Sequence, residues 1–261
     1  MIAVGERING MFNDVKKAIQ TRDARIIQDL ARRQTEAGAK YLDLNVGTAA
    51  EDPEAAMRWL VETTQAAVQT PIAIDSQRLR VIKAGLEVAR VPVMINSTKS
   101  DPEQLDKFMP LALEHNAALV CLTITAEGVP QDVNKRVEIC ANIVAKAQEH
   151  GMPMDKVFID PIVLPINVAQ DQPKYIIEVI QQTKVLSDPP PRTIVGLSNI
   201  SQGTSQRALI NRIALVMFIA AGLDAAIVDV LDSDLMDAAI TAEMLLNKQI
   251  YSDSFLKAGR M

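Results

Sequence analysis

Carboxylate and amide side chains recur at the ends of short apolar runs in this sequence. Asp75, Asn96, Asp160 and Asn199 each end such a run or directly follow it. A polar side chain in that position needs hydrogen-bond partners once the chain has folded. A carboxylate accepts two parallel hydrogen bonds from an N–H pair, and an amide offers a donor beside an acceptor. The set therefore suits a flat, neutral heterocycle that is rich in N–H groups and ring nitrogens.

Other polar residues stand at comparable positions, and their interpretation stays open. Asp43 and Asn45 follow the second apolar run and fit a binding role or a capping role equally well. After the first run come Glu6, Arg7 and Asn9. Three further residues are more typical of caps at strand-to-helix turns, namely Ser76, Ser97 and Asp229.

The residue types that catalyse hydrolysis or imine chemistry are missing from these positions. The two histidines, His115 and His150, lie near the ends of expected helices. Lys99 lies three residues past Asn96 and is more typical of a loop charge than of a Schiff-base nucleophile. Two cysteines cannot form a disulfide framework and lack metal-type spacing. We therefore expect no triad, no imine-forming lysine and no metal site.

Eight β-rich runs alternate with longer helical patterns and must position these side chains. The runs are 2–6, 41–45, 72–75, 93–96, 118–123, 157–160, 193–198 and 225–229. Several are nearly continuous apolar runs, as is typical of parallel strands that are covered on both faces. Asp52-Pro53 and Asp101-Pro102 each precede a helical stripe, which predicts an aspartate N-cap followed by proline at the first helical position.

Eight strand–helix units in 261 residues predict an α/β fold, a (β/α)8 TIM barrel that forms a single domain over residues 1–261. An open doubly wound sheet would favour a G-x-G-x-x-G loop after the first strand, but that turn reads GERINGMF. In a barrel the carboxyl ends of all strands meet at one face. The polar strand-end residues are therefore expected to converge there.

Composition and charge exclude several classes of partner. A net charge of −5 argues against a nucleic-acid surface, which needs clustered Lys and Arg. The longest apolar stretch, residues 213–223, is too short to cross a bilayer. The start MIAVGERING lacks the basic and hydrophobic regions of a secretory signal. We expect a cytoplasmic protein that binds neither nucleic acid nor a membrane.

Pterins present the hydrogen-bonding edges described above, and the motifs resemble a pterin-binding family. GERING, YLDLNVG, IAIDSQ, MINST, FIDPIVLP and GLSNISQG, in this order, resemble the methyltetrahydrofolate:corrinoid/iron-sulfur protein methyltransferases of acetogenic bacteria. The likeness spans essentially the whole chain. It implies a homodimeric barrel that moves the N5-methyl group of 5-methyltetrahydrofolate to cobalt(I) in the reductive acetyl-CoA pathway. The cobalamin would be carried by the corrinoid/iron-sulfur protein and not bound permanently.

The resemblance also implies roles for individual residues. Asp160 resembles the carboxylate that pairs with the pterin N3–H and 2-amino group, and Asn96 resembles an amide that reads the same ring. Asp75 is similar to the residue near N8, and Asn199 resembles the mobile, catalytic asparagine that hydrogen-bonds N5. Glu6 is kept as a candidate for the pocket. The remaining implied pocket residues are Gly196, Ser198, Gln202 and Arg207.

Related activities are separated by what the sequence lacks. Dihydropteroate synthases, which belong to the same group of barrels, carry a lysine-bearing stretch where this chain has GLSNISQG. The length leaves no room for the further modules of a full methionine synthase. Two alternatives stay open. One is the same chemistry with a corrinoid protein of methylamine, glycine-betaine or O-demethylation systems, and the other is a non-catalytic pterin-binding docking barrel.

Overall fold

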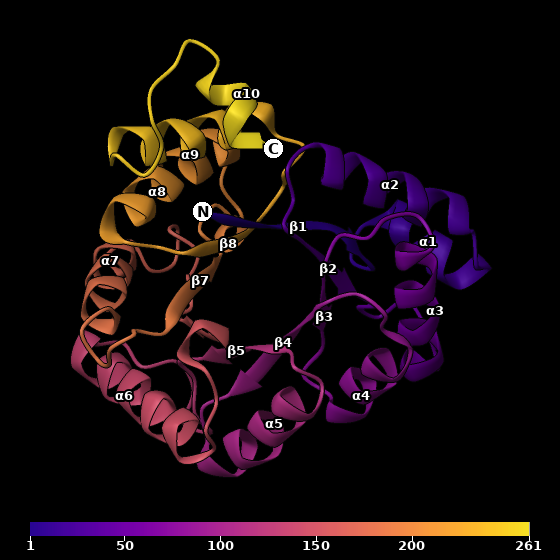
Figure 1. Ribbon diagram of the computed structural model, residues 1–261, viewed down its shortest axis with the longest axis horizontal. Coiled ribbons are helices and arrows are strands. Elements are labelled where there is room, and N and C mark those ends of the chain that lie inside the picture. The colour runs from indigo at the N-terminus through magenta and orange to yellow at the C-terminus, as the bar shows by residue number, and fades with distance from the viewer. Residues whose placement is uncertain (261) are drawn as a thin grey trace.

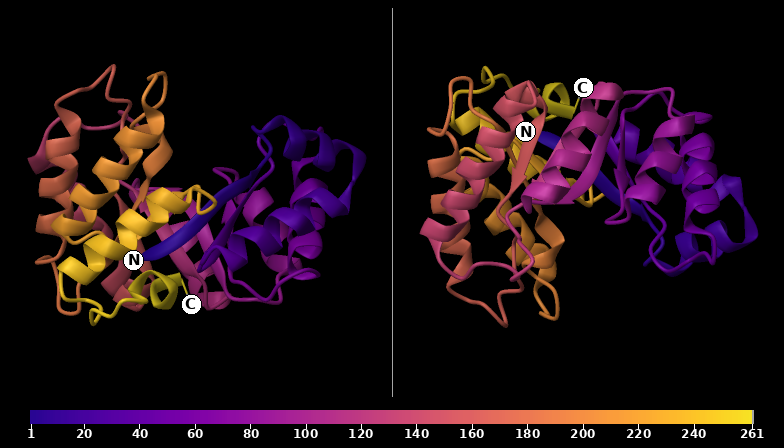
Figure 2. Two further views of the ribbon diagram at one scale, coloured as in Figure 1. Left: turned by 90° about the horizontal axis from the view of Figure 1, so that it is seen from above. Right: turned by 90° about the horizontal axis from the view of Figure 1, so that it is seen from below.

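The computed structural model describes residues 1–260, and it confirms the predicted (β/α)8 barrel. Eight parallel strands close in chain order, and the helices form a ring outside them (Figure 1). The edge-on views show helices flanking the strands on both sides (Figure 2). The strands are β1 (Ile2–Asn9), β2 (Tyr41–Asn45), β3 (Ile72–Asp75), β4 (Val93–Lys99), β5 (Ala118–Leu122), β6 (Val157–Asp160), β7 (Arg192–Gly196) and β8 (Ala225–Val228).

The helices cover the outer face of the sheet, and two pairs depart from a strict alternation. Both α1 and α2 follow β1, and α10 follows α9 at the end of the described chain. None of the helices in residues 1–260 is long and apolar enough to cross a membrane. Their bounds are α1 (Asn13–Thr21), α2 (Ala24–Glu36), α3 (Pro53–Gln65), α4 (Leu79–Val88), α5 (Pro102–Glu114), α6 (Val133–Glu149), α7 (Gln172–Thr183), α8 (Arg207–Ala221), α9 (Ser233–Leu245) and α10 (Phe255–Arg260).

One of the two predicted aspartate caps forms. The Asp52 carboxylate accepts hydrogen bonds from the N–H groups of Glu54 and Ala55 at the start of α3, as expected. Asp101 occupies the N-cap position of α5 with Pro102 after it, as predicted, but its carboxylate accepts from the Ala126 N–H at 3.0 Å and makes no capping hydrogen bond. Asp101 therefore ties the loop after β4 to the loop after β5.

Several strands end at residues other than those predicted. β1 and β4 run three residues further, and their pairing shifts register between Gly5 and Ile8 and between Asn96 and Thr98. Such irregularities let a strand continue while one side chain is redirected. β7 stops at Gly196, and a short 3-10 turn, η2 (Leu197–Asn199), follows it. Ser198, predicted to end the strand, therefore lies in this turn together with Asn199.

The packing inside the barrel explains why the polar side chains at the strand ends point into its mouth. The mouth is the open end of the barrel at which all strands have their carboxyl ends. Side chains two residues apart on a strand share a face. The internal cluster includes Val4, Ala73, Met94, Phe158 and Ile194, which are almost fully buried. The residues two positions further along the same strands lie one layer higher, and they are Glu6, Asp75, Asn96, Asp160 and Gly196.

Candidate functional site

Polar residues on β2, β3 and β4 lie side by side at the mouth. Asn45 stands in register with Asp75, and Asp75 stands in register with Asn96. The Asn45 amide donates a hydrogen bond to Asp75 Oδ2. The Asn96 amide donates to Asp43 Oδ1 at 3.0 Å, across 53 residues of sequence. Two of the expected site residues, Asp75 and Asn96, are thus brought together by Asp43 and Asn45, whose roles the sequence left open.

Asp43 is buried and Asp75 is half-buried, and the two carboxyl groups act on each other's pKa. Burial raises the pKa of Asp43 well above its usual range, and the nearby Asp75 charge raises it further. Burial raises the pKa of Asp75 to about 6, although hydrogen bonds from Asn45 and Asp43 oppose this shift. The two carboxyl groups therefore titrate as a coupled pair, in which the pKa of each member is raised.

This pair predicts a pH-dependent loss of stability that Asp75→Asn should reduce. A carboxyl whose pKa is higher in the folded chain stabilises the fold at low pH, and that stability is lost as pH rises from about 4 to about 6. The difference corresponds to about 3 kcal/mol. We expect Asp75→Asn to gain stability over wild type at pH 7.5 but not at pH 4, as measured by urea unfolding. Glu51→Gln, an exposed change, is the control, and an equal effect of Asp75→Asn at both pH values would contradict the prediction.

Asp160 stands apart from this pair at the end of β6. Its Oδ1 accepts a hydrogen bond from the Ile162 N–H at 2.7 Å, whereas Oδ2 accepts none from residues 1–260. Burial raises the pKa of Asp160 to about 7, and the Ile162 N–H and the charge of Arg136 oppose this. Asp160 thus offers a buried carboxylate oxygen with free capacity to accept an N–H donor from a ligand.

The turn that carries Asn199 is held from two sides. Ser198 Oγ donates to both carboxylate oxygens of Glu6, at 2.7 and 2.9 Å. Arg207 donates to the Ser198 carbonyl at 3.3 Å and to Ser201 Oγ at 3.2 Å. Burial raises the pKa of Glu6, which the Ser198 hydrogen bond opposes. The expected pocket residues Ser198 and Arg207 therefore brace this turn, and Glu6 belongs to the same network.

The Asn199 side chain itself is exposed and makes no hydrogen bond within the described residues. Its Nδ2 lies 3.1 Å from the position that a Cβ on Gly196 would occupy, so glycine at 196 leaves room for the amide. The Gln202 side chain is also exposed, and within residues 1–260 it makes no hydrogen bond to the other expected site residues. An amide without partners on a braced turn can reorient toward a ligand.

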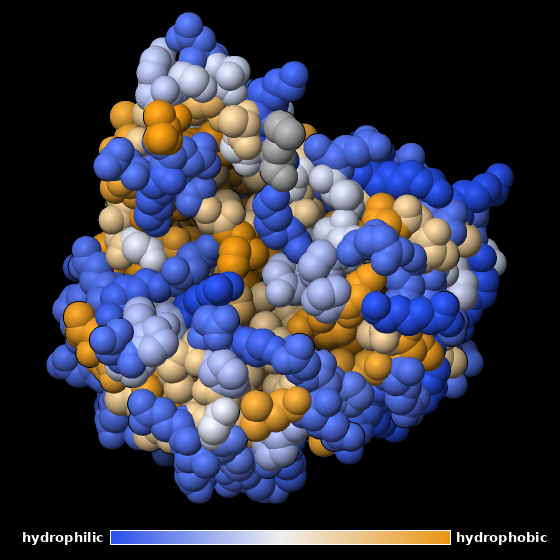
Figure 3. Space-filling view, viewed as in Figure 1, coloured by the Kyte–Doolittle hydropathy of each residue, from blue (hydrophilic) through white to orange (hydrophobic). Residues whose placement is uncertain are grey.

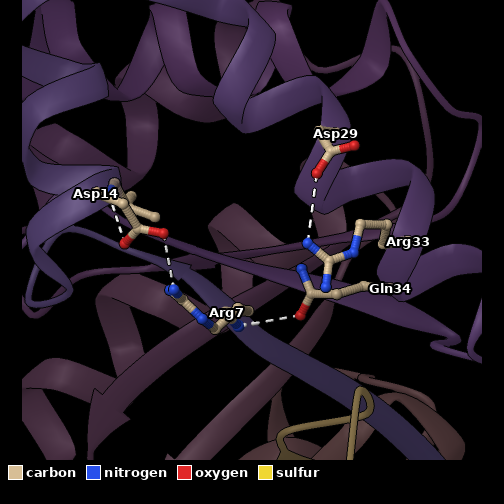
Figure 4. Close-up of polar contacts among 6 residues, drawn as sticks. Arg7, Asp14, Asp29, Arg33 and Gln34 are labelled. Carbon is tan, nitrogen blue, oxygen red and sulfur yellow. Dashed lines mark hydrogen bonds and ion pairs between the residues drawn. The ribbon is translucent and has the colours of Figure 1, made fainter.

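Arg7 lies outside the mouth although it follows Glu6 in the sequence. The backbone N–H of Arg7 donates to Gln34 Oε1 at 3.0 Å, and the Arg7 guanidinium forms an ion pair with Asp14 at 2.8 Å (Figure 4). The guanidinium also lies 4.1 Å from the centre of the Phe12 ring. Since alternate residues of a strand face opposite sides, Arg7 anchors α1 and α2 while Glu6 faces the interior.

The mouth is open and polar. A cavity of about 250 Å³ reaches Asn45 and Asp75, and a neighbouring one of about 310 Å³ is bordered by Ser97, Lys99 and Asp101. In the described part of the chain no group of three or more His, Cys, Asp or Glu side chains could hold a metal ion. Both cavities lie at the ends of β2 to β5, and neither is lined by Asp160 or Asn199.

The fold and the site define a (β/α)8 barrel that carries carboxyl and amide groups at its strand ends. The family model described as "Pterin binding enzyme" matches residues 5–229, and this chain belongs to that family. It is 32% identical over 262 residues to a methylcorrinoid:tetrahydrofolate methyltransferase of Eubacterium limosum, covering 100% of this chain and 96% of that protein.

Two further proteins are similar to this chain. The chain is 33% identical over 240 residues to a methionine synthase of Mycobacterium leprae, but this covers 87% of the chain and only 20% of that protein. The structure of a dihydropteroate synthase from Thermus thermophilus in complex with 6HMPPP superposes with a TM-score of 0.65 at 17% identity. That superposition covers 96% of this chain and 94% of the synthase. A sequence identity of 17% to the synthase shows a shared fold and nothing more.

Proposed function

We propose that this protein transfers the N5-methyl group of 5-methyltetrahydrofolate to cobalt(I) of a corrinoid/iron-sulfur protein in the reductive acetyl-CoA pathway. One observation carries the proposal. The mouth offers acceptors and an amide for a pterin, namely Asp160 Oδ2 and the Asn199 side chain, whereas both cysteine thiols of residues 1–260 are buried in the core and cannot take a methyl group. The acceptor must then come from another molecule, and the partner's cobalt(I) supplies it.

Some residues of the mouth bind the pterin ring, and Asn199 activates N5 for loss of its methyl group. Asp160 accepts the N3–H and 2-amino group of the pterin, and Asp75 and Asn96 contact other parts of the ring. N5 is a poor leaving group unless it gains a proton or a strong hydrogen bond as the methyl group departs. The Asn199 amide stabilises the N5–H form while solvent delivers the proton. The N5–CH3 bond breaks, cobalt(I) provides the electron pair for the new bond, and the proton stays on N5.

A second candidate is supported by the E. limosum relative. The name of that protein describes transfer from a methylcorrinoid to tetrahydrofolate, the reverse direction. The same site serves both directions, because catalysis lowers the same barrier either way. A corrinoid protein of a demethylation system is then the donor, and tetrahydrofolate is the acceptor.

An anaerobic transfer assay tests both candidates. The purified protein is mixed with 5-methyltetrahydrofolate and either free cob(I)alamin or a panel of purified corrinoid proteins, and the loss of the cobalt(I) absorbance is followed. We expect transfer to free cob(I)alamin and a higher kcat/KM with the physiological partner. The reverse assay uses the methylated corrinoid proteins with tetrahydrofolate. Tight folate binding without methyl exchange in any combination would overturn the proposal in favour of a docking barrel.

We also propose that the protein is a homodimer through α7 and α8. Leu209, Ile213 and Met217 recur every four residues along α8, and all three are exposed. They border an apolar groove of about 540 Å³ between the two helices. Apolar residues also show at the upper left of Figure 3, where Figure 1 places α8 and α9. A monomer seldom leaves such a patch uncovered.

The homodimer predicts a specific effect of Ile213→Glu. We expect sedimentation equilibrium to give twice the chain mass of 28.5 kDa for wild type and one chain mass for the variant. A buried unpaired carboxylate in the interface would oppose association. Leu113→Glu, at an exposed position on α5, is the matched control. A monomeric wild type would contradict the proposal.

A further inference from the structure

Arg136 is the largest fully buried side chain of the described chain, and the sequence did not single it out. It lies in the first turn of α6 with 0% of its surface exposed. Burying a guanidinium is unfavourable unless its N–H groups are satisfied. An apolar side chain of similar volume is often as stable or more stable at such a position. The contacts of Arg136 must therefore explain why a charged residue stands there.

Each nitrogen of the guanidinium bonds a different segment beside the mouth. Nε donates to the Pro130 carbonyl at 2.8 Å, in the loop after β5. Nη1 donates to the Pro161 carbonyl at 3.1 Å, directly after Asp160. Nη2 donates to Gln172 Oε1 at the start of α7. One rigid side chain thus joins two of the loops that border the site and the helix that follows them.

The segment after Asp160 needs this support. Ile162 adopts a φ of +61°, in the left-handed region that β-branched residues rarely enter. The backbone N–H of the same residue donates to Asp160 Oδ1 at 2.7 Å. An unfavourable backbone conformation persists only where neighbouring contacts enforce it. The hydrogen bond from Arg136 to Pro161 holds the carbonyl between the two residues.

The charge of Arg136 is not cancelled by a direct ion pair, because all three acceptors are neutral. The ionisable groups that act on its pKa are Asp160 at the end of β6, Asp132 just before α6, Cys140 within α6 and Asp171 just before α7. Asp160 acts most strongly of these. Conversely, Arg136 is the charged group within residues 1–260 that acts on Asp160, and it opposes the burial that raises the pKa of that carboxyl.

We propose that Arg136 is a positioning residue of the pterin site: it fixes the peptide that follows Asp160 and places a buried positive charge behind its carboxylate. The carboxylate is then held in the orientation and charge state that accept the N–H edge of the pterin. This inference rests on the proposed function, since it takes Asp160 as the acceptor of that edge.

Three variants test the proposal. Arg136→Met keeps the volume and removes the charge, and Arg136→Lys keeps the charge but cannot bond three segments at once. Arg58→Met removes an exposed arginine of α3 and serves as the matched control for the lost charge. The titration of the Asp160 carboxyl is followed by ¹³C NMR in the ligand-free protein, with Asp160→Asn to assign the signal. The affinity for 5-methyltetrahydrofolate is measured by calorimetry between pH 6 and 9.

We expect Arg136→Met to move the Asp160 titration midpoint upward by roughly one pH unit. The pH below which folate affinity declines should rise by the same amount. Arg136→Lys should keep the wild-type midpoint but bind folate several-fold more weakly, and Arg58→Met should match wild type in both measurements. A purely structural role would instead lower the thermal midpoint or the binding-competent fraction without moving the titration.

Two results would overturn the proposal: an unchanged midpoint in folded Arg136→Met, or wild-type affinity in Arg136→Lys. If Arg136→Met does not fold, the lysine variant still decides the positioning role. Failure of the proposed function would look different, because wild type would then bind 5-methyltetrahydrofolate without transferring its methyl group, or would bind no reduced pterin. The shift in the Asp160 titration needs no ligand and would still be observed.

Discussion

Asn199→Ala is expected to slow methyl transfer by roughly 10²–10³-fold, the usual effect of removing one preorganised donor from an active site. Its affinity for 5-methyltetrahydrofolate should change much less. The amide is needed most when N5 becomes basic as the methyl group leaves, so its contribution belongs to the transition state and not to ground-state binding. Single-turnover transfer to cob(I)alamin measures the rate, and calorimetry measures the affinity.

The substitution of Asn199 should affect catalysis without disturbing the fold. The Asn199 side chain makes no hydrogen bond within the described residues, so its removal should leave the thermal stability unchanged. Ser205→Ala, an exposed change in the loop that follows, is the control and should retain the wild-type rate. If Asn199→Ala lost rate and affinity to the same extent, the catalytic assignment would be wrong and the residue would be a binding residue.

Asp160→Ala should act on binding instead, with an affinity for 5-methyltetrahydrofolate reduced by roughly 10–100-fold because a buried N–H edge loses its acceptor. Wild-type affinity should also depend on pH. The pKa of Asp160 is raised to about 7 in the free protein, so the accepting carboxylate is lost as pH falls below that value. Affinity should therefore weaken from pH 8 to pH 6 in wild type and stay flat in the variant.

Calorimetry across this range distinguishes the role of Asp160 from that of other acidic residues. Asp160→Asn is the sharper variant, because it keeps the shape but replaces one acceptor by an amide donor that opposes the pterin N–H edge. Asp234→Ala, at an exposed carboxylate of α9, is the control for the lost charge. Near-normal affinity in Asp160→Asn at pH 8 would refute the pairing with the pterin.

Local patterns in the sequence were sufficient for the barrel and for most of its strands. The predicted bounds of β2, β3 and β6 agree with the structure because each is a short, mainly apolar run that ends at a polar residue. The period of two along a strand also places Asp75, Asn96 and Asp160 above the buried Ala73, Met94 and Phe158. These patterns involve residues only a few positions apart, so the strands and their inward-facing side chains can be predicted without knowledge of the fold.

The same patterns failed where a distant residue competed for a side chain or redirected a strand. Asp101 has the local sequence pattern of a helix cap, but its carboxylate accepts a hydrogen bond from the Ala126 N–H in another loop. β1 and β4 continue past their predicted ends because neighbouring strands shift register beside them. Neither this distant donor nor the register shift leaves a trace in the adjacent sequence.

The sequence by itself determined the barrel class and the residue types at its mouth, whereas the tertiary structure decided what each residue can do. Ser198 meets Glu6 across 192 residues, and Asn96 meets Asp43 across 53. Protonation depends equally on distant partners, since burial and neighbouring charges set the pKa of a carboxyl. Arg136 shows this most clearly: no local pattern distinguishes it from the other residues of α6, and only the closed barrel brings it to the carbonyl that follows Asp160.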